Sequence, residues 1–210
     1  MCYNVKVEKT ARQLVDAFQL SLGDWEGPKD RITLSEPLPA IIQTDGGREL
    51  HGMRFGFTPF WWSRDSKGGP MPGNAKAETV FELPMFRDAI QRHRAIVPVT
   101  GFYEWIGEKG SKRLLPFTMP DREIMLLPAV WDTWRMPDGT ARRSIATITC
   151  DPNDDIRPYH DRMPVILNDA DSERWLSPDA TRQELAALLG PVPMGELLAH
   201  PDQAFKPERV

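Results

Sequence analysis

The alternation of apolar and polar residues predicts a chain made mainly of short strands. Residues 144–150 set Ile145, Thr147 and Thr149 against Ala146, Ile148 and Cys150, which is a strand pattern. Residues 2–7, 95–99 and 124–131 carry similar patterns of strand length. Strands of this length at close spacing are typical of antiparallel sheets.

Turn residues divide these strands into hairpins. The Asp-Gly-Gly sequence at residues 45–47 separates an apolar strand within 32–43, led in by prolines, from a return strand at 50–57. Residues 108–112 and 137–140 carry further turn signals. We therefore expect hairpins at all three places.

Helical periodicity is confined to a few segments. Leu14, Phe18 and Leu22 recur at helical spacing, and Thr10 is a suitable N-cap before them. Residues 23–31 have the composition of a turn, residues 63–73 that of an exposed loop, and the chain from Gly190 onward that of a tail. These elements predict one mainly antiparallel α+β domain. The helices are expected at residues 10–22, 78–94 with a break near Pro84, 169–175 and 181–189.

Composition indicates an ordinary globular protein with a polar surface. The 210 residues suit one domain, or at most two small ones, with 40% hydrophobic and 27% charged residues. The sequence shows neither a membrane-spanning run nor a secretory signal, and the widely separated Cys2 and Cys150 form no disulfide framework. We therefore expect a cytoplasmic protein. Its net charge of −4 argues mildly against nucleic acid, unless positive residues cluster on one face.

Cys2 is the residue with the most distinctive chemistry. Removal of Met1 would place the α-amine and the thiol of Cys2 on neighbouring carbons. Both groups have ordinary pKa values of about 7.7 to 8.5, so each is a nucleophile near neutral pH. The thiol could attack an amide, or the amine could capture an aldehyde before the thiol closes a thiazolidine. Alternatively, Cys2 is a small buried apolar residue without a chemical role.

Three polar residues stand in apolar surroundings. Glu104 lies among aromatic residues, which disfavour the ionised carboxylate as neutral-pH acid–base chemistry requires. His160 precedes an apolar strand, and Asn74 follows the Gly/Pro-rich loop, where its amide could orient a thiol or an oxyanion. Each also has a structural interpretation: a strand-end carboxylate facing solvent, a hydrogen-bonded core histidine and a turn residue.

Aromatic residues at a loop edge are the remaining candidates. Trp61 and Trp62 could stack on bases, or they could belong to the core, since the chain has 7 tryptophans. The histidines show no metal-ligand spacing, and we expect neither a metal nor a cofactor.

Five stretches together resemble the SRAP family, the SOS-response-associated peptidase-like or abasic-site-processing proteins. They occur in family order over nearly the whole chain. The resemblance implies a single barrel-like α+β domain with flanking helices over residues 1–201 and a tail at 202–210. The five stretches are residues 1–2, 55–62, 74–79, 101–105 and 160–167.

This resemblance implies a monomeric DNA-repair protein of the SOS response whose partner is single-stranded DNA containing abasic sites. Cys2 would crosslink to the aldehyde of the abasic sugar after removal of Met1. Glu104 would open the sugar and move protons, His160 would protonate the sugar oxygen and assist reversal, and Asn74 would position Cys2. Weak lyase activity and proteolytic activity, including removal of Met1, are also implied.

The resemblance also assigns DNA contacts. Lys76 and Arg162 would hold phosphates, and the aromatic residues Trp61 and Trp62 would lie near a bend in the strand. The chain departs from the family at Tyr3, Asn4 and Lys76, where the family usually has Gly, Arg and Arg. It also has residues 35–39 in place of an Asn-containing motif, and little sequence after residue 201.

These departures affect the DNA contacts more than the catalytic residues. Two other functions therefore stay open. One is a peptidase or amidohydrolase that uses an N-terminal Cys2 with Glu104 and His160 as acid–base partners. The other is a non-covalent nucleic-acid-binding protein that does not depend on Cys2.

Overall fold

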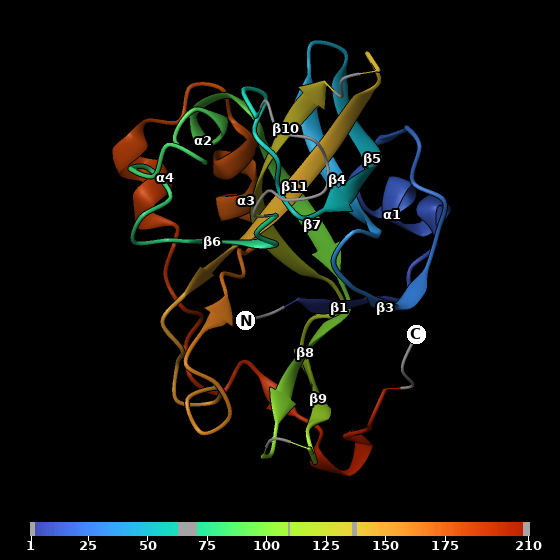
Figure 1. Ribbon diagram of the computed structural model, residues 1–210, viewed down its shortest axis with the longest axis vertical. Coiled ribbons are helices and arrows are strands. Elements are labelled where there is room, and N and C mark those ends of the chain that lie inside the picture. Colours follow the sequence, from blue (N-terminus) through green and yellow to red (C-terminus); the bar gives the residue numbers. More distant parts are fainter. Residues whose placement is uncertain (1–2, 63–70, 109, 136–137, 208–210) are drawn as a thin grey trace.

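Two β-sheets form the body of the protein, and the larger one fills the upper half of Figure 1. The computed structural model describes residues 3–62, 71–108, 110–135 and 138–207. In spatial order, the larger sheet contains β12 (Met163–Pro164), β11 (Ala141–Cys150), β10 (Met125–Arg135), β7 (Arg94–Val99), β4 (Pro37–Thr44), β5 (Gly47–Phe55) and β2 (Ser21–Leu22), with β6 (Asn74–Lys76) beside β11.

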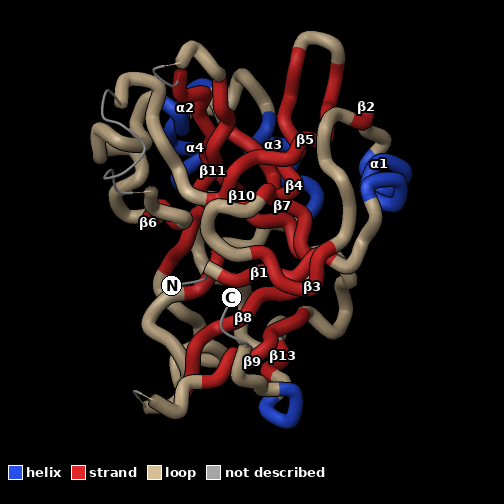
Figure 2. The backbone as a smooth tube through the Cα atoms, turned by 45° about the vertical axis from the view of Figure 1, so that its right-hand side comes forward, coloured by secondary structure: helices blue, strands red, loops and turns tan. Residues whose placement is uncertain are grey.

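A parallel pairing of β11 with β5 closes five strands of this sheet into a barrel, seen from a second direction in Figure 2. The pairing places Ser144 opposite Arg54 and Ile145 opposite Phe55. A closed sheet turns alternate side chains inward and the others outward, and the apolar positions on both faces of these strands belong to one continuous core. Fully buried members of this core include Leu38, Leu50, Met53, Phe55, Ile96, Val97, Leu127, Val130, Ile145 and Ile148.

The smaller sheet holds the N-terminal strand as an interior strand next to one edge. Its order is β13 (Leu198–Ala199), β9 (Arg113–Thr118), β8 (Gly101–Ile106), β1 (Asn4–Val7) and β3 (Lys29–Ile32). Both views show β1 crossing between the barrel and the β8–β9 hairpin (Figures 1 and 2). The register sets Asn4 opposite Tyr103, the neighbour of Glu104. The start of the described chain therefore lies at the junction of the two sheets.

Short helices cover the outside of the barrel. Figure 1 shows α2 (Ala89–Arg92), α3 (Asp169–Leu176) and α4 (Arg182–Ala187) on one side, and α1 (Ala11–Phe18) on the other. Thr10 caps α1 as predicted, in a capping box with Gln13. No helix in the described ranges is long and apolar enough to span a membrane.

A buried arginine joins two of these helices. Arg94, only 9% exposed, donates hydrogen bonds of 2.7–2.9 Å to backbone carbonyls and forms no ion pair among the described residues. These carbonyls belong to residues at the C-terminal ends of α2 and α3, where the helices provide no backbone donor for them. The Arg94 guanidinium supplies the missing donors to both helices. The four acceptors are the carbonyl oxygens of Ile90, Gln91, Trp175 and Ser177.

The α+β fold, its antiparallel sheets and its barrel-like form are confirmed. The long helix predicted at residues 78–94 is wrong, because turns occupy most of it and only α2 is helical. Residues 23–31 are not simply a turn, since β3 begins at Lys29 and pairs with β1. The chain from Gly190 onward is not a detached tail, since it returns to β9 through β13.

The domain boundary at residue 201 stays a prediction. Beyond it, Phe205 forms an antiparallel bridge with Leu114, with N–O distances of 2.8 and 3.1 Å.

Candidate functional site

Strand β11 connects several of the predicted site residues. Its Thr147 lies opposite Asn74 of β6, and the Thr147 hydroxyl donates to Asn74 Oδ1 at 2.8 Å. Asn74 is 8% exposed, and its Nδ2 has no hydrogen-bond partner in the described part of the chain. A buried amide nitrogen without an acceptor costs stability, which is typical of a group that binds a reactant. Asn74 therefore offers two donors at this site.

Glu104 and His160 meet although they lie far apart in the sequence. Glu104 is fully buried on β8, and its Oε2 lies 3.5 Å from Nε2 of His160. The predicted buried environment of Glu104 is confirmed, and the solvent-facing alternative is wrong. An imidazole in contact with a buried carboxylate can exchange protons with it and with a reactant, as general acid–base chemistry requires.

The other nitrogen of His160 is held by the chain that follows it. His160 Nδ1 lies 3.0 Å from the backbone nitrogen of Arg162, 3.2 Å from the Arg162 carbonyl oxygen and 3.0 Å from an Asp161 carboxylate oxygen. Donor and acceptor groups both face this nitrogen, so either tautomer of the ring has a partner. The ring can therefore present a protonated or an unprotonated Nε2 toward Glu104.

Arg162 is the centre of an ion-pair network. Its guanidinium donates to both carboxylate oxygens of Glu78 at 2.9 Å, to Asp151 at 2.8 Å and to the Thr149 carbonyl at 2.7 Å. Burial opposes the charge, but the hydrogen bonds and charge of Glu78 and the charge of Asp151 outweigh it and raise the pKa of Arg162. The Arg162 hydrogen bond lowers the pKa of Glu78 in turn. Phosphate binding by Arg162 stays a prediction, and a phosphate would have to compete with two carboxylates.

The chain before β1 fits tightly against the segment that precedes β6. A Cβ atom on Gly73 would come within 2.9 Å of the Tyr3 ring, and Tyr3 also packs edge-on against Phe55. Burial raises the pKa of the Tyr3 phenol. Tyr3 therefore lies beside the residue that precedes Asn74, while Asn4 pairs with β8. Cys2, the predicted nucleophile, lies outside the described residues.

The second cysteine is chemically inert in this fold. Cys150 is 3% exposed at the end of β11, and burial raises the pKa of its thiol to about 12. Because the thiolate is the reactive form, a thiol with this pKa is a poor nucleophile at neutral pH.

Aromatic side chains surround the turn at residues 59–62. Phe60 and Trp61 are 57% and 45% exposed, and the Trp61 and Trp62 rings lie 5.9 Å apart at a tilt of 50°. The Trp62 carbonyl accepts a 2.6 Å hydrogen bond from Nε1 of Trp134. Trp61 is therefore exposed, whereas the backbone of Trp62 is held by a strand of the barrel, and DNA stacking by either ring stays a prediction. Lys76, the other predicted DNA contact, is exposed on β6.

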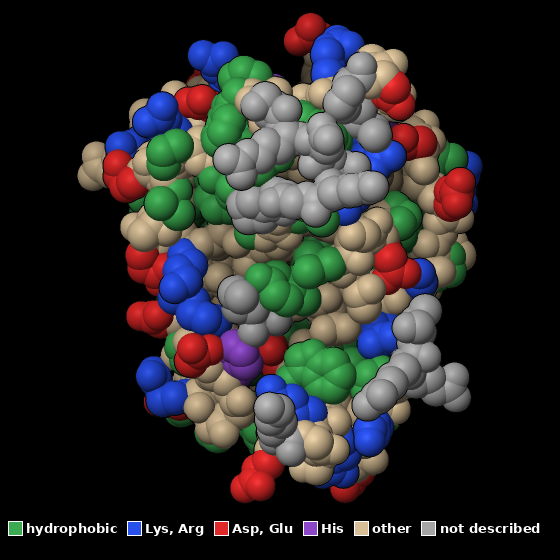
Figure 3. Space-filling model, viewed as in Figure 1, with side chains coloured by type: hydrophobic (Ala, Val, Ile, Leu, Met, Phe, Trp, Pro, Cys, Tyr) green, Lys and Arg blue, Asp and Glu red, His purple; other side chains and the backbone are tan. Residues whose placement is uncertain are grey.

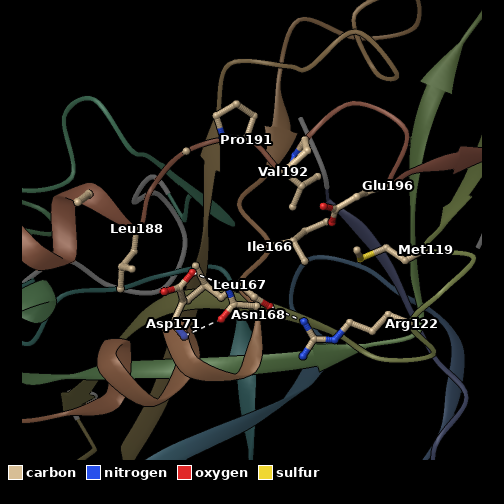
Figure 4. Close-up of a pocket in the computed structure, with 13 residues that line it drawn as sticks. Met119, Arg122, Ile166, Leu167, Asn168, Asp171, Leu188, Pro191, Val192 and Glu196 are labelled. Atoms are coloured by element: carbon tan, nitrogen blue, oxygen red, sulfur yellow. Dashed lines mark hydrogen bonds between the residues drawn. The ribbon is translucent and has the colours of Figure 1, made fainter.

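Two of the cavities among the described residues have polar or charged linings of interest, and both lie away from the Glu104–His160 pair. One, of about 350 Å³, is drawn in Figure 4, where Arg122 points to the Leu167 carbonyl and Asn168 caps α3 through Asp171. These three polar groups are engaged in hydrogen bonds, and Glu196 is the remaining charged residue of the lining. The second, of about 680 Å³, lies at the β5–β11 junction and is lined by Arg54, Arg142 and Arg143 among others. No cluster of His, Cys, Asp and Glu in the described ranges could hold a metal ion.

Sequence reasoning missed three residues of this site. They are Glu78, Asp151 and Thr147. Glu78 and Asp151 accept hydrogen bonds from Arg162, and Thr147 pairs with Asn74 along β11. The strand pattern of β11 was the available signal, since it identified the strand that carries Thr147 and leads into Asp151.

Comparisons with known proteins agree with this arrangement. The family model described as SOS response associated peptidase (SRAP) matches residues 1–203. The abasic site processing protein YoqW of Bacillus subtilis (strain 168) is 33% identical over 194 residues, covering 89% of this chain and 83% of YoqW. The abasic site processing protein YedK of Escherichia coli (strain K12) is 24% identical over 178 residues, covering 83% and 78%. A crystal structure of a protein from Bacteroides thetaiotaomicron matches with a TM-score of 0.86 and 26% identity, covering 95% of this chain and 91% of that one.

Proposed function

Since this chain belongs to the SOS response associated peptidase (SRAP) family, we propose that it processes abasic sites in single-stranded DNA by a covalent crosslink through Cys2. The buried Glu104–His160 pair beside the N-terminal strand is the observation that carries this proposal. Asn4 lies opposite Tyr103, and a chain of two residues reaches about 7 Å from there. The proposed crosslink requires the amine and thiol of Cys2 to reach the acid–base pair within that length of chain.

The proposed reaction converts an aldehyde and an aminothiol into a thiazolidine and water. Removal of Met1 by hydrolysis frees the α-amine. Ring opening of the abasic sugar gives an aldehyde at C1′, and the amine adds to this carbon. Loss of water leaves a C=N bond, and the Cys2 thiol then adds across it. The sulfur bonds to C1′ and the thiol proton passes to nitrogen, which closes the five-membered ring.

Glu104 and His160 supply the protons that these steps need. Opening of the sugar requires a proton on the ring oxygen and removal of one from the C1′ hydroxyl, and the dehydration requires a proton on the departing hydroxyl. We assign proton transfer during imine formation to Glu104 and protonation of the sugar oxygen to His160. The unpartnered donors of Asn74 would orient Cys2 for addition.

The proposed DNA contacts surround this centre. Lys76 is exposed and Trp61 is accessible for stacking, whereas Arg162 would exchange a carboxylate for a phosphate. Figure 3 shows one face of the molecule, where Lys and Arg side chains lie on either side of a central hydrophobic surface. A strand crossing it would contact hydrophobic groups in the middle and positive charge at the edges.

The intact mass of the protein tests this proposal. Full-length protein is incubated with a single-stranded oligonucleotide carrying one abasic site, with Cys2→Ala and Cys150→Ala alongside. We expect loss of Met1 and a heat-stable adduct, one water lighter than the sum of its parts, in the wild type and in Cys150→Ala only. A processed N-terminus that forms no adduct would favour the amidohydrolase or the non-covalent binder. Retention of Met1 on the purified protein would refute the thiazolidine.

The imine stage also permits a side reaction. An imine at C1′ acidifies the neighbouring C2′ proton, so β-elimination of the 3′ phosphate would give weak lyase activity. If this lyase reaction occurs, we expect the oligonucleotide to be cleaved only when Cys2 is present, in competition with the adduct. Gel analysis of the labelled oligonucleotide measures this cleavage.

A further inference from the structure

Three arginines line one cleft outside the Glu104–His160 centre. The cleft measures about 680 Å³ and lies where β5 and β11 meet. Arg54 is the penultimate residue of β5, and Arg142 and Arg143 lie near the start of β11. The lining also includes the polar residues Asp24, Ser35 and Thr133.

The arginines of this cleft form no direct ion pair with a described carboxylate, although hydrogen bonds and then the charges of Arg142 and Arg143 lower the pKa values of Asp138 and Glu49. In the described part of the chain, the arginine–carboxylate pairs within 4 Å all involve other arginines. The one acidic lining residue, Asp24, is already engaged: its Oδ1 accepts from Gly52 N at 2.9 Å and lies 3.1 Å from His51 Nδ1. The cleft therefore keeps its positive character.

The arginines also repel one another. Burial lowers the pKa of the Arg54 guanidinium, and the positive charge of Arg142 lowers it further. Like charges held together in a partly buried cleft destabilise the protein unless an anion enters. Such an arrangement is typical of a surface whose ligand supplies the missing negative charge.

The chain holds Arg54 in place for such a ligand. Its Nη2 donates to the Ser35 hydroxyl at 2.9 Å, and its Nη1 contacts the Met71 sulfur at 2.9 Å. Ser35 adopts a left-handed backbone with φ of 76°, and its backbone nitrogen donates to the Phe55 carbonyl at 2.7 Å. A non-glycine residue in this conformation costs free energy, so the surrounding structure enforces the position of its hydroxyl.

The other two arginines leave their donors available. The side chains of Arg142 and Arg143 form no hydrogen bond to described residues, and the guanidinium of Arg143 lies over the Trp131 ring at 5.9 Å. A guanidinium stacked on an indole keeps its in-plane N–H groups free. These groups match the oxygens of a phosphodiester.

The cleft and the acid–base centre lie along one strand. Arg143 precedes Thr147, the partner of Asn74, by four residues on β11, which corresponds to about 13 Å. The loop that carries Ser35 also carries Leu34, whose side chain lies against Gly73. A DNA strand leaving the centre in this direction would reach the cleft within a few nucleotides.

We propose that Arg54, Arg142 and Arg143 bind backbone phosphates of the strand on one side of the abasic nucleotide. This inference rests on the proposed function for the identity of the ligand, and it adds a phosphate-binding arm that neither Lys76 nor Arg162 supplies. The contacts reach only phosphates, so they set how much flanking strand the protein needs and not which bases it prefers.

Fluorescence anisotropy with a tetrahydrofuran abasic analogue tests the proposal without crosslinking, because the analogue cannot open to an aldehyde. The test variant is Arg142→Gln/Arg143→Gln. Its control is Arg12→Gln/Arg87→Gln, which removes the same charge from exposed positions outside the cleft. Loss of two single-strand phosphate contacts should reduce the slope of log K against log salt by about 1.4 and weaken binding about 25-fold at 0.1 M salt.

Trimming the strand locates the contact. In the wild type, shortening the oligonucleotide on one side of the analogue should weaken binding, whereas shortening on the other side should not. In Arg142→Gln/Arg143→Gln this dependence on length should disappear, and in the control it should persist. Equal affinity and equal salt slope in the two double variants would overturn the proposal.

A calorimetric titration with inorganic phosphate separates the strand from a free anion. If the cleft variant loses phosphate binding but binds the oligonucleotide as the control does, the cleft serves a free anion and the proposal is wrong. The anisotropy measurement does not involve Cys2. Failure of the adduct test with retained cleft-dependent binding would therefore refute the crosslink alone.

Discussion

Substitution of Gly73 by alanine should disturb both the fold and the reaction. An added Cβ would lie 2.7 Å from Leu34 Cδ2 and 2.9 Å from both Phe55 Cε2 and Tyr3 Cδ1. Carbon atoms in contact prefer about 3.5–4.0 Å, so all three neighbours would have to move. Overpacking of this kind costs about 1–3 kcal/mol. For a chain of this size it should lower Tm by about 2–12 °C.

The same substitution should slow adduct formation. Gly73 accepts a 2.9 Å hydrogen bond from Thr147 N and precedes Asn74, while Tyr3 follows Cys2 in the chain. A displacement approaching 1 Å at reacting groups can cost about 100-fold in rate, so we expect a loss of about 10- to 100-fold. Differential scanning fluorimetry and quenched time courses with abasic single-stranded DNA measure the two effects.

A matched glycine provides the control. No atom lies within 4 Å of the Cβ position of Gly190, so Gly190→Ala should change neither Tm nor rate. Tyr3→Ala in the Gly73→Ala background should recover part of the stability, because it removes one of the three clashes. The reasoning is refuted if Gly73→Ala melts and reacts as Gly190→Ala does.

Three further substitutions address the acid–base pair, the inert thiol and the buried arginine. Glu104→Gln should slow adduct formation by about 10²- to 10⁴-fold with little change in the affinity for a tetrahydrofuran strand, whereas the exposed Glu26→Gln should be silent in both assays. The folded pKa of Cys150, about 12 against an ordinary 9.0, means that only the unfolded chain loses this proton between those pH values. This contribution to stability is therefore lost as pH rises through that window, by up to about 1.4 kcal/mol per unit, and Cys150→Ala should flatten the slope in urea denaturation between pH 8 and 10.5. Arg94→Met should lower the free energy of unfolding by about 3 kcal/mol because it leaves buried carbonyls without a donor, whereas the exposed Arg87→Met should cost less than about 0.5 kcal/mol in the same denaturation experiment.

Apolar runs and alternation made most of the barrel predictable. β4, β5, β7, β10 and β11 all fall within or close to their predicted ranges, because most of their buried positions are apolar, on both faces of β7 and on much of the others. β3 was not predicted because its sequence does not alternate between apolar and polar residues. Three of its four residues are polar, and two of these are exposed at the edge of the smaller sheet, so they carry no alternation.

The predicted helix at residues 78–94 shows where local propensity fails. Turns replace it from Ala77 to Asp88, and Phe86 is buried while packing against Phe57. An apolar periodicity can be satisfied by successive turns when the barrel supplies the contacts. The prediction missed that tertiary context, which a single sequence does not contain.

The chemistry of the site was more predictable than its connections. Glu104 and His160 were chosen for their surroundings, but the chain separates them by more than fifty residues and no local pattern predicts their 3.5 Å contact. Arg162 was predicted as a phosphate ligand, and its two carboxylate partners come from Glu78 and Asp151, which only the fold brings together. Long-range pairing of this kind depends on sheet register, which a sequence specifies only indirectly.

The pairing that closes the barrel is short. Two register pairs join β5 to β11, whereas eight join β4 to β5 and seven join β10 to β11. A closure with so few register pairs should open locally more often than these two long hairpins, and its amides should exchange with solvent before theirs. Arg54 lies on one side of this closure and Arg142 on the other. A DNA backbone whose phosphates bind both arginines would link β5 to β11. Bound DNA should therefore slow hydrogen exchange at Ser144 and Ile145.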